Sequence, residues 1–245
     1  MNHIIAIFMK QLTTLIKVPI MIGMSLFFFA LAFLMVIFNT EDPPCYSCVP
    51  AYICTECVTA AAFELPQSPI AQVLASVMGL SIVMYSAGLV NEDRLTGNLK
   101  FMSMAEVNPW QYLAGTFVSV LLVAAAIVVP FALLGFFSEG ANLLWFMIVG
   151  LFGALVAALF GITIGLYGNP LVSIIGPFSL GLLPMFSQVN DTVANISRFV
   201  FVQQINVAIA DLGADLTESF IIIAANGVIC FLIFIFIHRK NKLIV

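Results

Sequence analysis

The sequence predicts an all-α membrane protein with six transmembrane helices, and three observations lead to this prediction. First, 62% of the residues are hydrophobic and only 8% are charged, which leaves too little polar surface for a water-soluble domain. Second, the apolar residues gather in stretches of about 20, the length needed to cross the hydrocarbon core of a bilayer. Third, the cationic residues collect in alternate connecting segments, as they do in multi-pass membrane proteins.

Six stretches meet the length and hydropathy criteria for a transmembrane helix. They cover residues 18–38, 70–90, 111–137, 143–166, 171–189 and 220–237. None of them contains Asp, Glu, Lys, Arg or His, which disfavours a self-sufficient ion-driven carrier because such carriers need ionisable groups inside the membrane. Little remains for a soluble domain, so residues 1–245 are predicted to form a single transmembrane domain.

The cationic residues orient these spans. Seven of the eight Lys and Arg residues precede the first span, separate the second from the third, or follow the last, namely Lys10, Lys17, Arg94, Lys100, Arg239, Lys240 and Lys242. Because cationic segments stay in the cytoplasm, both termini and the loop 91–109 are predicted to be cytoplasmic. The net charge of −4 gives no indication of nucleic-acid binding.

Residues 1–17 are predicted to form a helix that lies in the cytoplasmic interface of the membrane. Apolar residues such as Ile4, Phe8 and Leu12 recur at helical spacing, and polar residues occupy the other face. Pro19 favours a break before the first span. The alternative is that this segment simply extends that span.

The outer loop 39–69 contains four of the five cysteines, arranged as two C-x-x-C pairs: Cys45, Cys48, Cys54 and Cys57. On an oxidising outer face these cysteines favour structural disulfides, with three possible pairings that the sequence does not distinguish. A zinc-type metal site is an alternative, although zinc sites usually separate their pairs by more residues, so no metal is favoured. Redox-active thiols are the third possibility.

The cytoplasmic loop 91–109 is predicted to contain a short amphipathic helix. Asn91 would cap its start, and Glu92 and Asp93 would lie in its first turn, where the helix dipole favours negative charge. Pro109 would limit its end. Residues at three- and four-residue spacing would form its apolar face, namely Leu95, Leu99 and Met102.

Two further patterns concern packing. Residues 190–218 are too polar for a full crossing, so one or two short outer helices are expected between spans five and six, and a re-entrant placement is left open. In the fourth span, small residues recur at every fourth position, namely Gly153, Ala157, Gly161 and Gly165. This spacing predicts a smooth helix face that another backbone approaches closely.

The sequence shows no sign of enzymatic activity in this chain. It lacks the G-x-x-x-x-G-K-[ST] loop that binds ATP phosphates, so any nucleotide energy must come from a second polypeptide. His3 and His238 have no nucleophile or orienting acid placed around them. No cofactor is therefore predicted for this chain itself.

The six-span plan, the N-terminal helix and the segment after the second span together resemble the type-2 ABC-transporter permease family. The residues that match its motif are Glu92, Asp93, Arg94, Gly97, Leu99, Lys100, Pro109, Tyr112 and Gly115. A second match is Leu182-Leu183-Pro184. Thr116 departs from the pattern, because a lysine often follows the glycine, and the outer segment lacks the usual Asn-Pro pair, which leaves the cargo open.

This resemblance implies a membrane subunit of an exporter in the bacterial cytoplasmic membrane. Such a subunit moves an amphipathic peptide, antibiotic or lipid-like substrate by alternating access, while ATP and Mg bind to a separate ABC ATPase. A second permease subunit, identical or different, would complete the complex, and nucleic acid would play no part. The coupling helix that docks into the ATPase would use Glu92, Asp93, Arg94, Leu95, Gly97, Leu99, Lys100 and Met102.

Two other classes of function remain open. One is a membrane thiol oxidoreductase that uses the outer C-x-x-C pairs, since one thiolate of such a pair can attack a disulfide while the other resolves it. The other is a membrane immunity or binding protein that sequesters a toxic peptide without transporting it. Neither requires an ATPase-docking helix.

Overall fold

Every described helix in the computed structural model of this chain is α-helical except for one π-helical turn, and the described residues contain no strand. The structure describes residues 2–17, 69–99, 109–139, 142–167, 172–186, 196–210 and 216–241, together with isolated positions between 23 and 34. The predicted all-α class is confirmed for these residues.

The helices follow in the order α1 (Asn2–Lys17), α4 (Pro69–Val77), the π-helix η2 (Met78–Ile82), α5 (Val83–Leu95), α7 (Pro109–Glu139), α8 (Leu143–Tyr167), α9 (Val172–Phe186), α11 (Phe201–Ala210) and α12 (Leu216–Asn241). Four stretches are long and apolar enough to cross a membrane: Ile70–Leu95, which joins α4, η2 and α5, then Trp110–Phe137, Leu143–Leu166 and Thr217–Phe236. These four are what a multi-pass membrane protein requires.

The described residues do not establish the two other predicted spans. Residues 18–38 lie outside the described residues except for isolated helical positions. The predicted span 171–189 corresponds to α9, whose 15 residues make a helix of about 22 Å, less than the hydrocarbon thickness of about 30 Å. The residues on either side of α9 are outside the described part of the chain. A count of six spans therefore stays a prediction.

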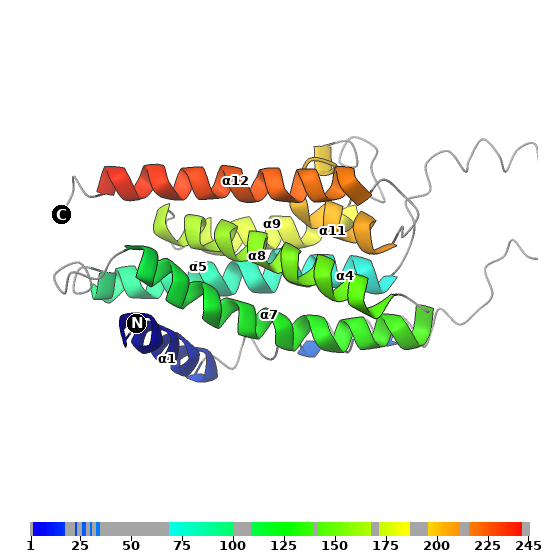
Figure 1. Ribbon diagram of the computed structural model, residues 1–245, viewed down its shortest axis with the longest axis horizontal. Helices are drawn as coiled ribbons and strands as arrows, with labels where there is room; N and C mark the ends of the chain where they lie inside the picture. Colours follow the sequence, from blue (N-terminus) through cyan, green and yellow to red (C-terminus); the bar gives the residue numbers. More distant parts are fainter. Residues whose placement is uncertain are drawn as a thin grey trace, which may run out of the picture.

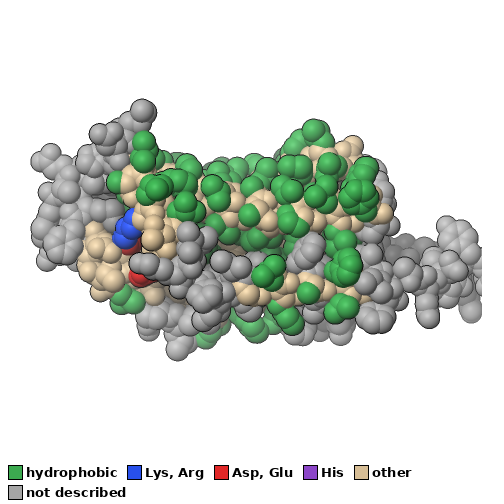
Figure 2. Space-filling view, turned by 90° about the horizontal axis from the view of Figure 1, so that it is seen from below, with side chains coloured by type: hydrophobic (Ala, Val, Ile, Leu, Met, Phe, Trp, Pro, Cys, Tyr) green, Lys and Arg blue, Asp and Glu red, His purple; other side chains and the backbone are tan. Residues whose placement is uncertain are grey.

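The long helices run side by side along one axis of the molecule (Figure 1). The start of α1, the end of α5, the start of α7 and the end of α12 lie at one end, which we call the terminal end. The start of α4, the end of α7 and the short helix α11 lie at the opposite end. In the face seen in Figure 2, charged side chains gather at the terminal end, whereas apolar side chains cover much of the described surface along the rest. An apolar band with charge at its end suits a protein embedded in lipid.

The central helix α8 packs against α5, α7, α11 and α12. Its smooth face allows this: a Cβ added at Gly165 would lie 2.6 Å from the Ala87 carbonyl oxygen of α5. Gly161 likewise faces Val83 and Ser86 of α5, and Gly153 faces the Ile205 side chain of α11. The close helix packing predicted from this spacing of small residues is confirmed.

In the predicted outer segment 190–218, the structure has the helix α11, which is buried among α4, α8, α9 and α12. Hydrogen bonds link this region to α12: Ser219 Oγ donates to Gln204 Oε1 (2.7 Å), and Asn226 Nδ2 donates to the Phe199 carbonyl (2.9 Å). Protein therefore covers this short helix, which is the condition that a re-entrant segment has to meet. A re-entrant placement stays a prediction.

A small apolar core closes the terminal end of the bundle and underlies the site described next. Its members come from α1, α5, α7, α8 and α12, and they are Ile7, Val90, Tyr112, Leu113, Ile162 and Phe234. We call this group the terminal core. It is what attaches the first helix of the chain to the ends of the long helices.

Candidate functional site

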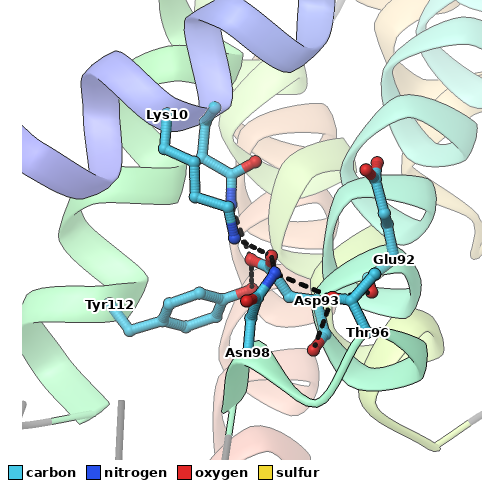
Figure 3. Close-up of polar contacts among 7 residues, drawn as sticks. Lys10, Glu92, Asp93, Thr96, Asn98 and Tyr112 are labelled. Atoms are coloured by element: carbon cyan, nitrogen blue, oxygen red, sulfur yellow. Dashed lines mark hydrogen bonds and ion pairs between the residues drawn. The ribbon is translucent and has the colours of Figure 1, made fainter. Parts of the chain in front are cut away.

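Among the described residues, the most concentrated polar arrangement at the terminal end is built around the Asp93 carboxylate of α5, whose residue is only 2% exposed. At Oδ1 the carboxylate accepts hydrogen bonds from Lys10 Nζ, which also forms an ion pair with it, and from Asn98 Nδ2 (3.3 Å). At Oδ2 it accepts from Gln11 Nε2 (2.9 Å) and from the Tyr112 hydroxyl (3.0 Å). We call these five residues the Asp93 cluster (Figure 3).

The sequence of α1 explains how Lys10 and Gln11 reach Asp93. Ile7 and Gln11, one turn apart, are both buried on the side facing the bundle, whereas Ile5 and Met9 point away and are exposed. Lys10 lies between these two sides of the helix, so its long side chain extends toward α5 while part of it remains in contact with solvent.

Gly115 of α7 allows α1 to come close enough for these contacts. A Cβ at this position would lie 2.8 Å from Ile7 Cγ2 and 3.2 Å from the Ile4 carbonyl oxygen. The missing side chain therefore lets the backbone of α1 settle on α7. Tyr112 lies one turn before Gly115 and faces the same junction, where its hydroxyl reaches the carboxylate.

The turn after α5 brings Asn98 back toward Asp93. Thr96 ends the helix, with its backbone N–H donating to the Glu92 carbonyl (2.9 Å) and its hydroxyl donating to the same oxygen (2.8 Å). Gly97 then adopts φ = +73°, the left-handed conformation that commonly follows a helix end. The reversal places the Asn98 amide within reach of both Asp93 Oδ1 and Thr96 Oγ1 (2.7 Å).

Arg94 links α5 to a different helix. Its Nη1 donates to the Leu166 carbonyl in the last turn of α8 (3.3 Å), and its Nη2 donates to Asn91 Oδ1 (3.1 Å). A cation beside the carbonyls that end a helix is favourable, because those groups carry the negative end of the helix dipole. Asp93 and Arg94 thus attach the end of α5 to two different sides of the bundle.

Electrostatics explain why Asp93 needs so many donors. A carboxylate in the last turn of a helix lies at the negative end of the dipole, and burial adds a cost of desolvation. Lys10 supplies the opposite charge, and three neutral donors satisfy the remaining lone pairs. The arrangement holds these helices in fixed positions relative to one another.

Among the described residues, no three His, Cys, Asp or Glu side chains come together as they would for a metal ion.

The prediction that a separate helix starts at Asn91 is wrong. Residues 91–95 are the last turns of α5, which runs on from the membrane span without a break. Glu92 and Asp93 therefore lie in a last turn and not in a first turn. The hydropathy criterion ended the span at the first charged residues, whereas the donors around Asp93 allow the helix to continue. Helical conformation resumes at residues 98 and 99, beyond the Gly97 turn.

The other residues predicted to contact an ATPase have different surroundings. Glu92 is exposed and points away from the Asp93 cluster (Figure 3). Leu95 is 67% exposed, whereas Leu99, beyond the Gly97 turn, packs against the terminal core. The common apolar face predicted for these two leucines is therefore not present. Lys100 and Met102 lie outside the part of the chain whose side chains are described.

The four cysteines of the predicted outer loop, Cys45, Cys48, Cys54 and Cys57, all lie outside the described residues, so their pairing stays a prediction. Cys230 of α12 is a free, buried thiol. Its carbonyl oxygen accepts a hydrogen bond from Thr163 Oγ1 of α8 (3.4 Å), so this part of α12 lies directly against α8.

Sequence reasoning missed the roles of Lys10, Gln11 and Asn98 in this cluster. Lys10 and Asp93 are 83 positions apart, and nothing in a single sequence links two residues at that separation. Two local signals were present: the glycine at position 115, one turn after Tyr112, and Gly97 directly before Asn98. Each marks a place where backbone comes close or reverses, and each turned out to border the cluster.

Comparison of this chain with models of protein families, with curated proteins and with solved structures found no match. Its function is therefore inferred from the residues themselves and from the resemblance of the 91–115 segment to a permease motif.

Proposed function

We propose that this chain is the permease subunit of an ATP-driven exporter in a bacterial cytoplasmic membrane. Its six spans and cytoplasmic termini would form half of the membrane pathway, with an identical or related subunit forming the other half. ATP and Mg would bind to a separate ABC ATPase. The cargo would be an amphipathic peptide, an antibiotic or a lipid-like molecule.

The observation that carries this proposal is the two-sided last turn of α5. One side is fixed, because Asp93 is buried in its cluster and Arg94 is bonded to the end of α8. The other side presents Glu92 and Leu95 outward. A rigid, exposed turn at the charged end of a membrane protein is suited to bind a soluble partner, because little conformational freedom is lost on binding.

The position of Leu95 separates it from the other exposed apolar residues. Most of those lie along the long helices, where lipid would cover them. Leu95 instead directly follows three charged residues, Glu92, Asp93 and Arg94, at the end of the span. An exposed leucine is ordinary by itself, but this one falls within the segment that resembles the coupling motif, next to charges that could steer a partner.

An ATPase would drive such a permease through differential binding. Nucleotide changes the shape of the ATPase, and this shifts the permease only as far as the ATPase binds one permease conformation more tightly than the other. A contact on the end of α5 is favourable for this purpose, because α5 packs along α8, the helix at the centre of the bundle.

Replacing Leu95 by aspartate tests the proposal. The partner to use is an ABC ATPase encoded next to this chain and recognised by its G-x-x-x-x-G-K-[ST] motif. We expect Leu95→Asp to raise the Kd of the permease for the ATPase by about 30-fold, the effect of losing about 2 kcal/mol at an interface hot spot, and so to lower the amount of ATPase retained on the purified permease.

Leu144→Asp is the matched control. Leu144 is 70% exposed, close to the 67% of Leu95, but it lies in the first turn of α8 at the opposite end of the bundle, where the helix dipole tolerates an acid. This variant should retain the ATPase as the unmodified chain does. Equal retention by both variants, or no retention by the unmodified chain, would overturn the proposal.

A further inference from the structure

We propose that the Asp93 cluster is the joint that passes movement of the ATPase-contacting segment to α1 and α7, with Lys10, Asp93 and Tyr112 as positioning residues for export. This inference rests on the proposed function. It assigns the buried carboxylate an internal task, in contrast to the direct docking role that its place in the motif implies.

Three segments of the chain donate hydrogen bonds to the Asp93 carboxylate. Lys10 and Gln11 come from α1, Tyr112 comes from α7, and Asn98 comes from the turn that begins the 96–108 connection. Asn98 and Lys10 donate to the same oxygen, Oδ1. A displacement of the turn therefore changes the hydrogen bonding of one of the two carboxylate oxygens that α1 contacts.

Burial differs sharply between the two members of the ion pair. Asp93 is almost fully enclosed, whereas the side chain of Lys10 is 41% exposed. Water could hydrate the Lys10 ammonium if the pair separated, but Asp93 would then be a buried charge without its counter-ion, which is costly. Asp93 therefore holds on to its donors, and the helices that carry those donors have to move with the end of α5.

Direct contacts extend this connection across the terminal end of the bundle. At the start of α7, the centroid of the Trp110 ring lies 5.7 Å from the ring centroid of Phe231 and 6.2 Å from that of Phe234, both on α12. On the other side, Arg94 holds the end of α8. A push on one turn at the end of α5 would thus reach α1, α7, α8 and α12. Discrete contacts of this kind are how packed helices pass on a rigid-body movement.

The competing explanation is that the cluster only stabilises the fold, and a pair of neutral substitutions separates the two. Lys10→Met and Asp93→Asn each leave one member of the ion pair without its opposite charge. The double variant removes both charges, so the cost of an unpaired buried charge disappears and folding should recover. In Asp93→Asn the side-chain amide oxygen can still accept from Gln11 and Tyr112, but the ionic link between α1 and α5 is gone.

The readout is the stimulation of ATP hydrolysis when the permease in nanodiscs is added to its ATPase. We expect the double variant to unfold near the unfolding temperature of the unmodified chain and to retain the ATPase equally. Its stimulation of ATP hydrolysis should be lower by about fivefold or more. Thr13→Ala, on the exposed side of α1, removes a hydroxyl whose hydrogen bond within the described residues is a local one to the Met9 carbonyl, and it should behave as the unmodified chain.

Each outcome is informative. If the double variant folds, binds the ATPase and stimulates ATP hydrolysis as the unmodified chain does, the Asp93 cluster does not pass on movement. The proposed function would be unaffected by that result. Failure of the unmodified chain to bind the ATPase would overturn the proposed function itself. If the double variant does not fold, Tyr112→Phe gives the same readout, because it removes one hydroxyl and no charge. If Tyr112→Phe reduces the stimulation of ATP hydrolysis but retains the ATPase equally, the result supports the proposed role of the Asp93 cluster. Unchanged stimulation contradicts that role.

Discussion

Gly165→Ala is expected to lower the free energy of unfolding by about 3 kcal/mol, the upper part of the range for overpacking a buried contact. The added Cβ would lie 2.6 Å from the Ala87 carbonyl oxygen and 2.9 Å from Val90 Cβ. The first of these is a backbone atom, so α5 and α8 would have to separate along their contact. The measurement is the temperature at which the detergent-purified protein loses its monodisperse peak.

Gly161→Ala should be at least as damaging, because its Cβ would overlap the Ser86 hydroxyl and the Val83 carbonyl. Gly176→Ala in α9 is the control, since the nearest atom is Ile164 Cδ1 at 3.4 Å, an ordinary contact with the end of a flexible side chain. Alanine there should cost much less than at Gly165, because its better helix propensity offsets part of the strain that Pro177 imposes on a residue with a Cβ directly before it. Equal melting temperatures for the Gly165 and Gly176 variants would show that the α5–α8 contact is looser than described.

Asp93→Ala is expected to cost about 3 kcal/mol of stability, because it leaves buried donors with no acceptor. Gln11 and Tyr112 are both buried and would lose their acceptor, and Lys10 would lose its ion pair. Lys10 can turn to solvent, so most of the cost falls on the neutral donors. Thermal or denaturant unfolding in detergent, compared with the unmodified chain, measures the loss.

A pair of tyrosines gives a graded check on the worth of the Asp93 hydrogen bonds. Tyr112→Phe removes one hydrogen bond to a charged acceptor and should cost about 1.5 kcal/mol or somewhat more. Tyr85→Phe is the matched control, because the Tyr85 hydroxyl is buried and makes no hydrogen bond to the described residues. It should be neutral or stabilising. A reversed order of the two variants would mean that the Tyr112 bond contributes little.

The class of the protein and much of its helix packing could be predicted from the sequence, because both depend on local composition. Apolar length alone located the helices α7, α8 and α12, and the glycines at positions 161 and 165 predicted the α8 face that packs on α5. These signals extend over neighbouring residues and need no knowledge of distant partners.

The boundary of α5 and the composition of the site could not be predicted in the same way. Hydropathy ended the second span at residue 90, yet the helix continues to Leu95 because Asp93 finds donors on α1, α7 and the following turn. Those donors come from segments far apart in sequence. For the same reason Asp93 was assigned to an outward docking face, although its charge is used inside the protein.

The central proposal is that the chain receives its driving force from a separate ATPase. The most direct measurement is ATP hydrolysis in nanodiscs by the purified chain alone, by an ABC ATPase encoded beside it alone, and by the two together. We predict no hydrolysis by the chain alone and a faster rate for the mixture than for the ATPase by itself. ATP hydrolysis by the purified chain, or a rate for the mixture equal to that of the ATPase alone, would contradict this proposal.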